Sequence, residues 1–172
     1  MATKTPNMPF GTDEPPRITP MSQAFPALLT AVRALIIAEH EFGEVGYSFD
    51  PAFADWLQDT ERTHEQLTTS LRHFHALPYV IPEDRPLQRM ACLIDAMLGH
   101  EEPGGARRLC REMRVTFFSR FQLLGIGPTA LHRNALLAQA RHLVAALAAL
   151  PLFDGAPEAV DDELQPELIA AA

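Results

Sequence analysis

Apolar side chains recur at alternating steps of four and three residues along 52–77. At about 100° of rotation per residue, this spacing places them on one face of an α-helix that packs against other helices. Asp50 is a suitable N-cap, and the proline that follows it fits the first helical position. The centre of the face is polar, because Thr60 and His64 stand where leucine is expected. The positions of this seam are Phe53, Leu57, Thr60, His64, Leu67, Leu71 and Phe74.

The same periodicity predicts further helices, which are separated by glycine and proline. Thr19 is a suitable cap for the first of them, with Pro20 at its first helical position. In the fourth helix, we expect the inward face to extend to Leu124. The sequence therefore predicts an all-α fold, a single antiparallel bundle of about five helices. Besides 52–77, these helices are expected at 21–42, 86–98, 106–124 and 128–150.

Both ends of the sequence are expected to lie outside the bundle. Residues 1–20 contain five prolines and few apolar side chains, so they cannot bury enough surface to offset the entropy lost on ordering. The residues after Pro151 are acidic and rich in small side chains. We therefore expect a flexible proline-rich arm at 1–19, the helical bundle at 20–151 and a flexible acidic tail at 152–172.

The formal net charge of −8 disfavours general affinity for nucleic acid or for an anionic membrane, because both attract positive charge. Six of these eight excess charges lie in 152–172, which has no basic residue, so the remaining body is close to neutral. No run approaches the ~20 apolar residues that span a membrane. Cys92 and Cys110 are far apart and suit a reducing compartment. These features predict a cytoplasmic protein without a membrane segment.

Glu61 and His64 form a Glu-x-x-His step, in which both side chains can aim at one point. Di-iron bundles combine two such steps with a glutamate from each of two further helices. Glu39 would supply one such carboxylate from the first helix, but a second Glu-x-x-His step is absent from the sequence. We therefore expect no cofactor and a structural, hydrogen-bonded role for His64. The alternative is a transition metal ion held by Glu39, Glu61 and His64.

Arg107, Arg111 and Arg114 form a basic row at steps of four and three along the fourth helix. Guanidinium groups bind carboxylates and phosphates through paired hydrogen bonds. The row could therefore bind an acidic protein partner or a phosphate-bearing ligand. The ordinary interpretation, which we favour for this pattern, is a solvated face that balances the charge of the acidic second helix.

The sequence contains no catalytic nucleophile motif and no phosphate-cradling glycine loop. This pattern favours a non-enzymatic accessory or regulatory protein that presents helical faces to a protein partner, with homodimerisation as one form of that contact. A metal-binding bundle built on Glu39, Glu61 and His64 is one alternative. An anion- or phosphate-binding module built on the fourth-helix arginines is the other.

Overall fold

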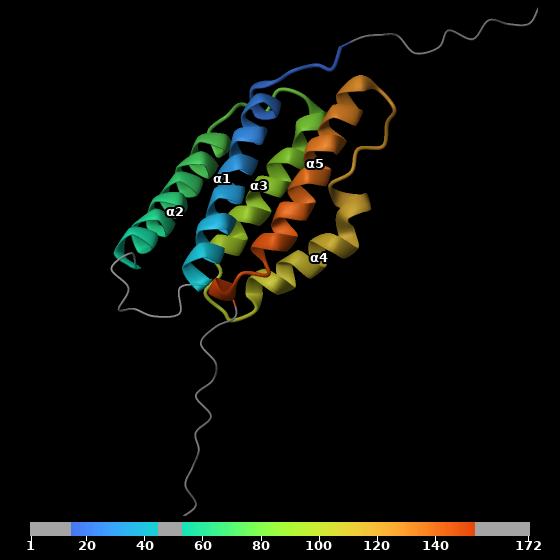
Figure 1. The fold of residues 1–172 in the computed structure, drawn as a ribbon. Helices are drawn as coiled ribbons and strands as arrows, with labels where there is room; N and C mark the ends of the chain where they lie inside the picture. The colour runs from blue at the N-terminus through green and yellow to red at the C-terminus, as the bar shows by residue number, and fades with distance from the viewer. Residues whose placement is uncertain (1–14, 45–52, 154–172) are drawn as a thin grey trace, which may run out of the picture.

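The computed structural model describes residues 15–44 and 53–153, most of which are helical (Figure 1). No strand is present in these two ranges, so the predicted all-α bundle is confirmed. Within the described residues, the α-helices are α1 (Pro20–Glu44), α2 (Phe53–His75), α3 (Arg85–Leu98), α4 (Gly105–Arg120) and α5 (Pro128–Leu147), and the short 3-10 helices are η1 (Pro82–Asp84) and η2 (Pro151–Phe153).

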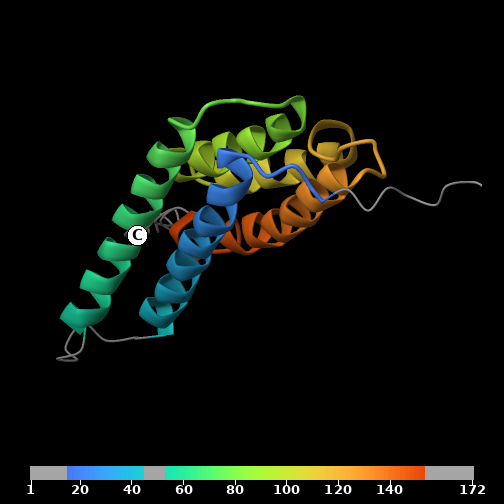
Figure 2. The same ribbon diagram turned by 90° about the horizontal axis from the view of Figure 1, so that it is seen from above.

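The helices pack around one apolar core. α1 and α2 form an antiparallel hairpin, and both α3 and α5 pack against α1 (Figures 1 and 2). α4 lies at the edge of the bundle, with α1, α3 and α5 between it and α2 (Figure 1). All five helices contribute to the core, through residues that include Phe25, Leu35, Leu67, Phe74, Leu87, Ile94, Met113, Leu137 and Val144.

α1 begins with a reciprocal cap between Thr19 and Ser22. The Ser22 amide donates to Thr19 Oγ1 (3.2 Å), and the Thr19 amide donates to Ser22 Oγ (2.9 Å). The bond from Ser22 satisfies a backbone N–H group that has no partner inside the helix. The predicted cap at Thr19 and the predicted first position at Pro20 are therefore confirmed.

The segment Pro20–Glu41 of α1 is long and apolar enough to cross a membrane, judged by length and composition alone. The sequence analysis expected no run of this kind. However, 56% of the most apolar stretch of this segment is buried inside the bundle. Leu28, Val32 and Leu35, for example, are part of the shared core. The absence of a membrane segment stays a prediction.

From Leu57 onward, where its side chains are described, the predicted seam of α2 is buried only in its second half. Its last three positions are buried, and the Phe74 ring packs against Phe25 of α1 with centroids 5.6 Å apart. Toward the start of the helix, Leu57 is 40% exposed, while Thr60 and His64 are partly buried. The far end of the α1–α2 hairpin extends beyond the other helices (Figure 2). Among the described residues, the first half of the seam therefore has only α1 to pack against.

α4 ends at Arg120 rather than at Leu124. Leu124 is 99% exposed, so the prediction that it faces the core is wrong. Asn134 of α5 explains the early end of the helix. Its Oδ1 accepts from the Leu123 amide (2.9 Å), and its Nδ2 donates to the Leu123 carbonyl (3.0 Å). The side chain thus binds both backbone groups that a continued helix would have used.

The fold starts earlier than the predicted boundary at residue 20. Thr19 is buried, and the Arg17 amide donates to Thr129 Oγ1 of α5 (2.9 Å). The last residues of the predicted arm therefore pack on the bundle. Residues 1–14 lie outside the described part of the chain, as does the predicted helix cap Asp50.

The fold also continues past the predicted boundary at residue 151. Phe153 is buried, and its carbonyl accepts from the Gly104 amide just before α4 (3.2 Å). Gly104 has a φ of 71°, a left-handed conformation that favours glycine. η2 therefore belongs to the bundle and contacts the start of α4. Residues 154–172 lie outside the described part of the chain.

A buried ion pair joins three segments that are distant in sequence. Asp84 of η1 and Arg133 of α5 have fully buried side chains, and Arg133 Nε donates to Asp84 Oδ1 (3.0 Å). Arg133 Nη2 donates to the Arg17 carbonyl (2.8 Å) and to Thr19 Oγ1 (3.2 Å). Among the described residues, the remaining Asp84 Oδ2 and Arg133 Nη1 have no partner. The hydrogen-bonding capacity of the pair is therefore only partly used, and each buried charge is neutralised by the other.

We expect Asp84→Ala to lower the free energy of unfolding by about 3–5 kcal/mol, because it leaves the Arg133 guanidinium buried without a counter-charge. The double variant Asp84→Leu/Arg133→Met should lose much less than the sum of the two single changes, since no charge stays buried. Urea unfolding followed by helical circular dichroism measures each loss.

The exposed Asp59–Arg62 pair on α2 provides the control, with side chains 57% and 74% exposed. Arg62→Ala should change the free energy of unfolding by only about 0–1 kcal/mol. If the losses at Asp84 and Arg133 simply add, the two side chains are not coupled as the structure indicates.

Candidate functional site

α4 is strongly basic and lies at the edge of the bundle, where it offers two surfaces for binding. It carries five arginines and one glutamate, whereas α2 carries four acidic residues and two arginines. Other helices separate α2 from α4, so these two oppositely charged helices are not neighbours in the bundle (Figure 1).

The predicted arginine row lines a groove between α4 and α5. This groove has a volume of about 340 Å³, and Arg107, Arg111 and Arg114 all line it. Arg107 Nε donates to the Ala148 carbonyl (3.3 Å), which holds the start of the row against the end of α5. The structure therefore gathers the row on one surface. Small side chains form the opposite wall: Ala145, Ala148 and Ala149.

The row leads to an exposed aromatic ring. Phe118 follows Arg114 by one helical turn and is 65% exposed. Arg141 of α5 places its Cζ 5.9 Å from the Phe118 ring centroid, a distance at which a guanidinium and an aromatic face attract each other. Sequence reasoning missed both residues, although Phe118 continues the four-and-three spacing of the row. We call this surface the α4–α5 face: Arg107, Arg111, Arg114, Arg141 and Phe118.

The helices that form the α4–α5 face have no carboxylate on that side. α5 contains no Asp or Glu, and the single acidic residue of α4, Glu112, lines the groove on the other side of α4. There Glu112 Oε1 accepts from Arg120 Nη1 (2.9 Å). The positive charge of the α4–α5 face is therefore not matched by acids of its own two helices.

Cys110 lies in the α4–α5 groove as a buried thiol. Burial raises its pKa above the ordinary value of 9.0, and the nearby charge and hydrogen bond of Arg114 offset part of that rise. The thiol is therefore neutral at pH 7, and a neutral thiol is a poor nucleophile. Cys92 also has a free thiol, but it is exposed and lines the second groove.

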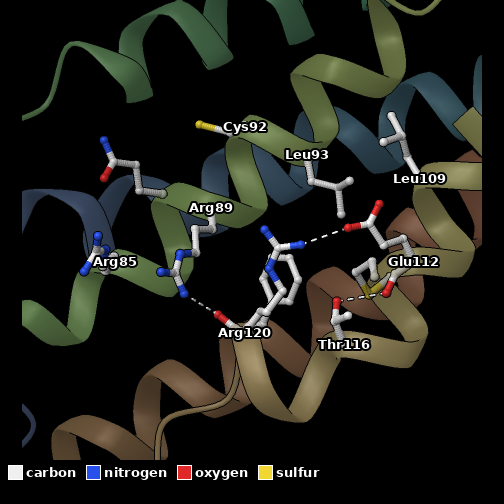
Figure 3. A pocket seen from close by; sticks show the side chains of 11 residues that line it. Arg85, Arg89, Cys92, Leu93, Leu109, Glu112, Thr116 and Arg120 are labelled. Atoms are coloured by element: carbon white, nitrogen blue, oxygen red, sulfur yellow. Dashed lines mark hydrogen bonds and ion pairs between the residues drawn. The ribbon is translucent and has the colours of Figure 1, made fainter.

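The second groove lies between α3 and α4 and has a volume of about 370 Å³ (Figure 3). Arg85 and Arg89 come from α3, while Glu112 and Arg120 come from α4. Sequence reasoning did not identify this groove, because its two walls are distant in sequence. The only local signal is the spacing of Arg85 and Arg89 by one helical turn. Apolar side chains also line the groove: Leu93, Leu109, Met113 and Phe121.

Two hydrogen bonds fix the walls of the α3–α4 groove. Arg89 Nη1 donates to the Arg120 carbonyl at the C-terminal end of α4 (2.9 Å). A cation is favourable there because the helix dipole makes that end negative. The side chain of Arg120 runs along the groove to Glu112 (Figure 3). The groove is therefore lined with guanidinium groups in defined positions.

The predicted metal ligands are brought together only in part. Glu39 of α1 and His64 of α2 interact electrostatically, whereas Glu61 is exposed. Burial raises the pKa of the Glu39 carboxyl, and the charge of His64 offsets part of that rise. Among the described residues, no group of three or more His, Cys, Asp or Glu side chains has an arrangement that could hold a metal ion. His64 is therefore close enough to the Glu39 carboxyl for its charge to influence that group.

Comparisons with known proteins find no matching family model, no matching curated protein and no matching solved structure. The function of the chain must therefore be inferred from its own surfaces.

Glu39→Gln should raise the melting temperature at pH 7, because burial disfavours the charged carboxylate. A raised pKa means that the folded chain binds the proton more readily than the unfolded chain. Between the ordinary value of 4.5 and the raised folded value, wild-type stability should therefore fall as the pH rises. The advantage of the glutamine variant should shrink below pH 4.5, which a series of thermal melts at different pH values would measure.

Glu41→Gln is the matched control, since it makes the same charge change at an exposed position of α1. It should not reproduce this pH-dependent gain. The same melts with added iron, manganese or zinc test the metal alternative. If a metal ion binds, it should raise the melting temperature of the wild type and make Glu39→Gln and His64→Leu the less stable chains.

Proposed function

We propose that the protein is a non-enzymatic accessory protein that binds an acidic segment of a partner protein through the α4–α5 face. The observation that supports this most directly is the row of Arg107, Arg111 and Arg114, which line one groove beside the exposed ring of Phe118. Arginine binds carboxylates through paired, charge-assisted hydrogen bonds. An acidic segment would bring several carboxylates to this row of guanidinium groups.

The apolar part of the face narrows the kind of segment that fits. Phe118 is exposed beside the row, and Val115, which is 84% exposed, adds a second apolar side chain on the outer side of α4. Arginine and aromatic side chains, phenylalanine among them, are enriched at protein interfaces. A partner segment that carries both carboxylates and an apolar side chain would therefore match the face.

The length of the row suits a short segment. Arg107 and Phe118 are about 16 Å apart along the helix axis, at 1.5 Å per residue. This length corresponds to about three turns of a partner helix. The alanines of the opposite wall have short side chains, so a partner backbone can approach α5 closely.

A nucleic acid is a weaker candidate for this face. Its phosphates could bind the same arginines. However, binding a duplex or a long single strand requires positive charge over a wide protein surface. The formal net charge of −8 opposes that, whereas a short acidic peptide contacts only the basic face.

Site-specific photo-crosslinking from position 118 would identify the partner in cells of the source organism. We expect a photoreactive phenylalanine analogue there to attach to a protein, at an acidic stretch that also holds an apolar residue. The same analogue at the exposed position of Leu57 on α2 should not give this product. Crosslinks to nucleic acid alone, or to the acidic residues 154–172 of the same chain, would contradict the proposal.

With the partner identified, the triple variant Arg107→Gln/Arg111→Gln/Arg114→Gln should weaken binding at least about tenfold, by loss of three charge-assisted contacts. The loss should be largest at low salt, since salt screens exposed charges. Titration calorimetry at two salt concentrations would measure it.

Arg33, Arg62 and Arg72 give a matched control, because they are exposed and lie on α1 and α2. Changing these three residues to Gln alters the net charge by the same amount and should leave binding within about twofold. Equal losses from the two triple variants would assign the effect to net charge and overturn the role of the face.

A further inference from the structure

The α3–α4 groove combines an apolar floor with a positively charged rim. Met113 and Phe121 are 2% and 6% exposed, and Leu93 and Leu109 are partly buried. Three arginines and one glutamate line the groove. Its volume of about 370 Å³ lies near the lower end of the ~300–1,000 Å³ typical of small-molecule sites. We propose that this groove binds a small anion with a short hydrocarbon chain, either a carboxylate or a phosphate monoester.

Arg89 and Arg120 are the groups that would hold the anionic head. A guanidinium has five N–H donors. The bond from Arg89 to the Arg120 carbonyl and the bond from Arg120 to Glu112 each use one of them. Both guanidiniums therefore retain donors, and the two bonds keep their positions defined. Arg85, one turn before Arg89 on the same groove, adds a third positive charge.

Glu112 occupies the position of a competing anion. Its Oε1 lies 2.9 Å from Arg120 Nη1, with both side chains more than half exposed. A ligand head group that binds Arg120 would compete with this carboxylate or repel it. Removing the charge with Glu112→Gln should therefore strengthen binding of an anion.

The composition of the groove argues against other small ligands. A divalent cation would be repelled, because three arginines and only one glutamate line the groove. A nucleobase would need an exposed aromatic face for stacking, but the single aromatic lining residue, Phe121, is 6% exposed. The apolar floor instead suits an alkyl chain, whose burial contributes about 0.8 kcal/mol per methylene group.

Cys92 provides a reporter at the edge of the groove. It is exposed and lines the groove, whereas the only other cysteine, Cys110, is buried on the opposite side of α4. Alkylation by N-ethylmaleimide, which is uncharged, should therefore modify Cys92 first. A ligand in the groove should slow this reaction without changing the rate at Cys110.

The probes are octanoate and octyl phosphate, with octanol as the uncharged control and acetate as the control without a chain. We expect one or both of the two anionic probes to slow alkylation of Cys92 in the full chain at least about threefold at saturation. Octanol and acetate should have little effect at the same concentration. The more effective anionic probe would identify the head group.

Substitutions of the charged residues at the rim of the groove, which are Arg85, Arg89, Glu112 and Arg120, test the assigned contacts. Arg89→Gln and Arg120→Gln should each raise the half-protecting concentration about tenfold, as expected for loss of a charged hydrogen bond. Glu112→Gln should lower it. Arg108→Gln is the control, because Arg108 is on α4 but pairs with Glu102 and does not line the groove. If either of the first two variants fails to fold, Arg85→Gln replaces it.

Several results would overturn the proposal. These are no protection by either anionic probe at millimolar concentration, equal protection by octanol, or unchanged protection in all rim variants. Binding to phosphatidylglycerol vesicles without any response to the soluble probes would likewise exclude a free small ligand, because it would indicate a membrane surface instead. A loss of protection in Arg108→Gln equal to that in the rim variants would reduce the effect to net charge.

Discussion

The buried pair of Asp84 and Arg133 is the contact on which the arrangement of the helices most depends. It joins η1, just before α3, to α5, and through Arg17 and Thr19 it also holds the segment that leads into α1. A buried ion pair is weak evidence for net stability, because its desolvation cost can exceed its attraction. It is, however, selective about geometry, because any packing that separates the two groups leaves charges buried and unpaired. The pair therefore fixes how α3 and α5 sit against α1, and α4 packs on the surface that α3 and α5 form.

The helices and the arginine row could be predicted from sequence, because both depend on spacing within one helix. The cap at Thr19 and the position of Pro20 follow from local chemistry in the same way. The role of Arg133 did not emerge, although it precedes Leu137 and Ala140 on the same face of α5. A polar residue on an apolar face is visible in a sequence, but its partner, 49 residues away at Asp84, is not. For the same reason, the α3–α4 groove could not be found from one helix alone.

Two positions that were predicted to face the core, Leu124 and Leu57, are exposed for physical reasons. Leu124 continues the apolar spacing of α4, but Asn134 binds both backbone groups of Leu123 and ends the helical path before it. Leu57 continues the seam of α2, but within the described part of the chain that end of the hairpin has only α1 beside it (Figure 2). Each of these residues continues the helical periodicity, but tertiary contacts determine whether another helix packs on its side chain. The polar residues Thr60 and His64 also lie in this part of the α2 seam, and both are only partly buried. His64 interacts electrostatically with Glu39 there.

α4 presents two chemically different surfaces because Glu112 lies on one side of it only. The groove toward α3 has an internal anion, while the face toward α5 has none on its own helices. Both ends of α4 are also attached to the bundle: at the start by Arg107 to Ala148, and at the end by Arg89 to the Arg120 carbonyl. Two ligands affect each other only if at least one of them shifts a conformation to which the other is sensitive. A helix fixed at both ends resists such a shift, so occupancy of one α4 surface should have little influence on the other.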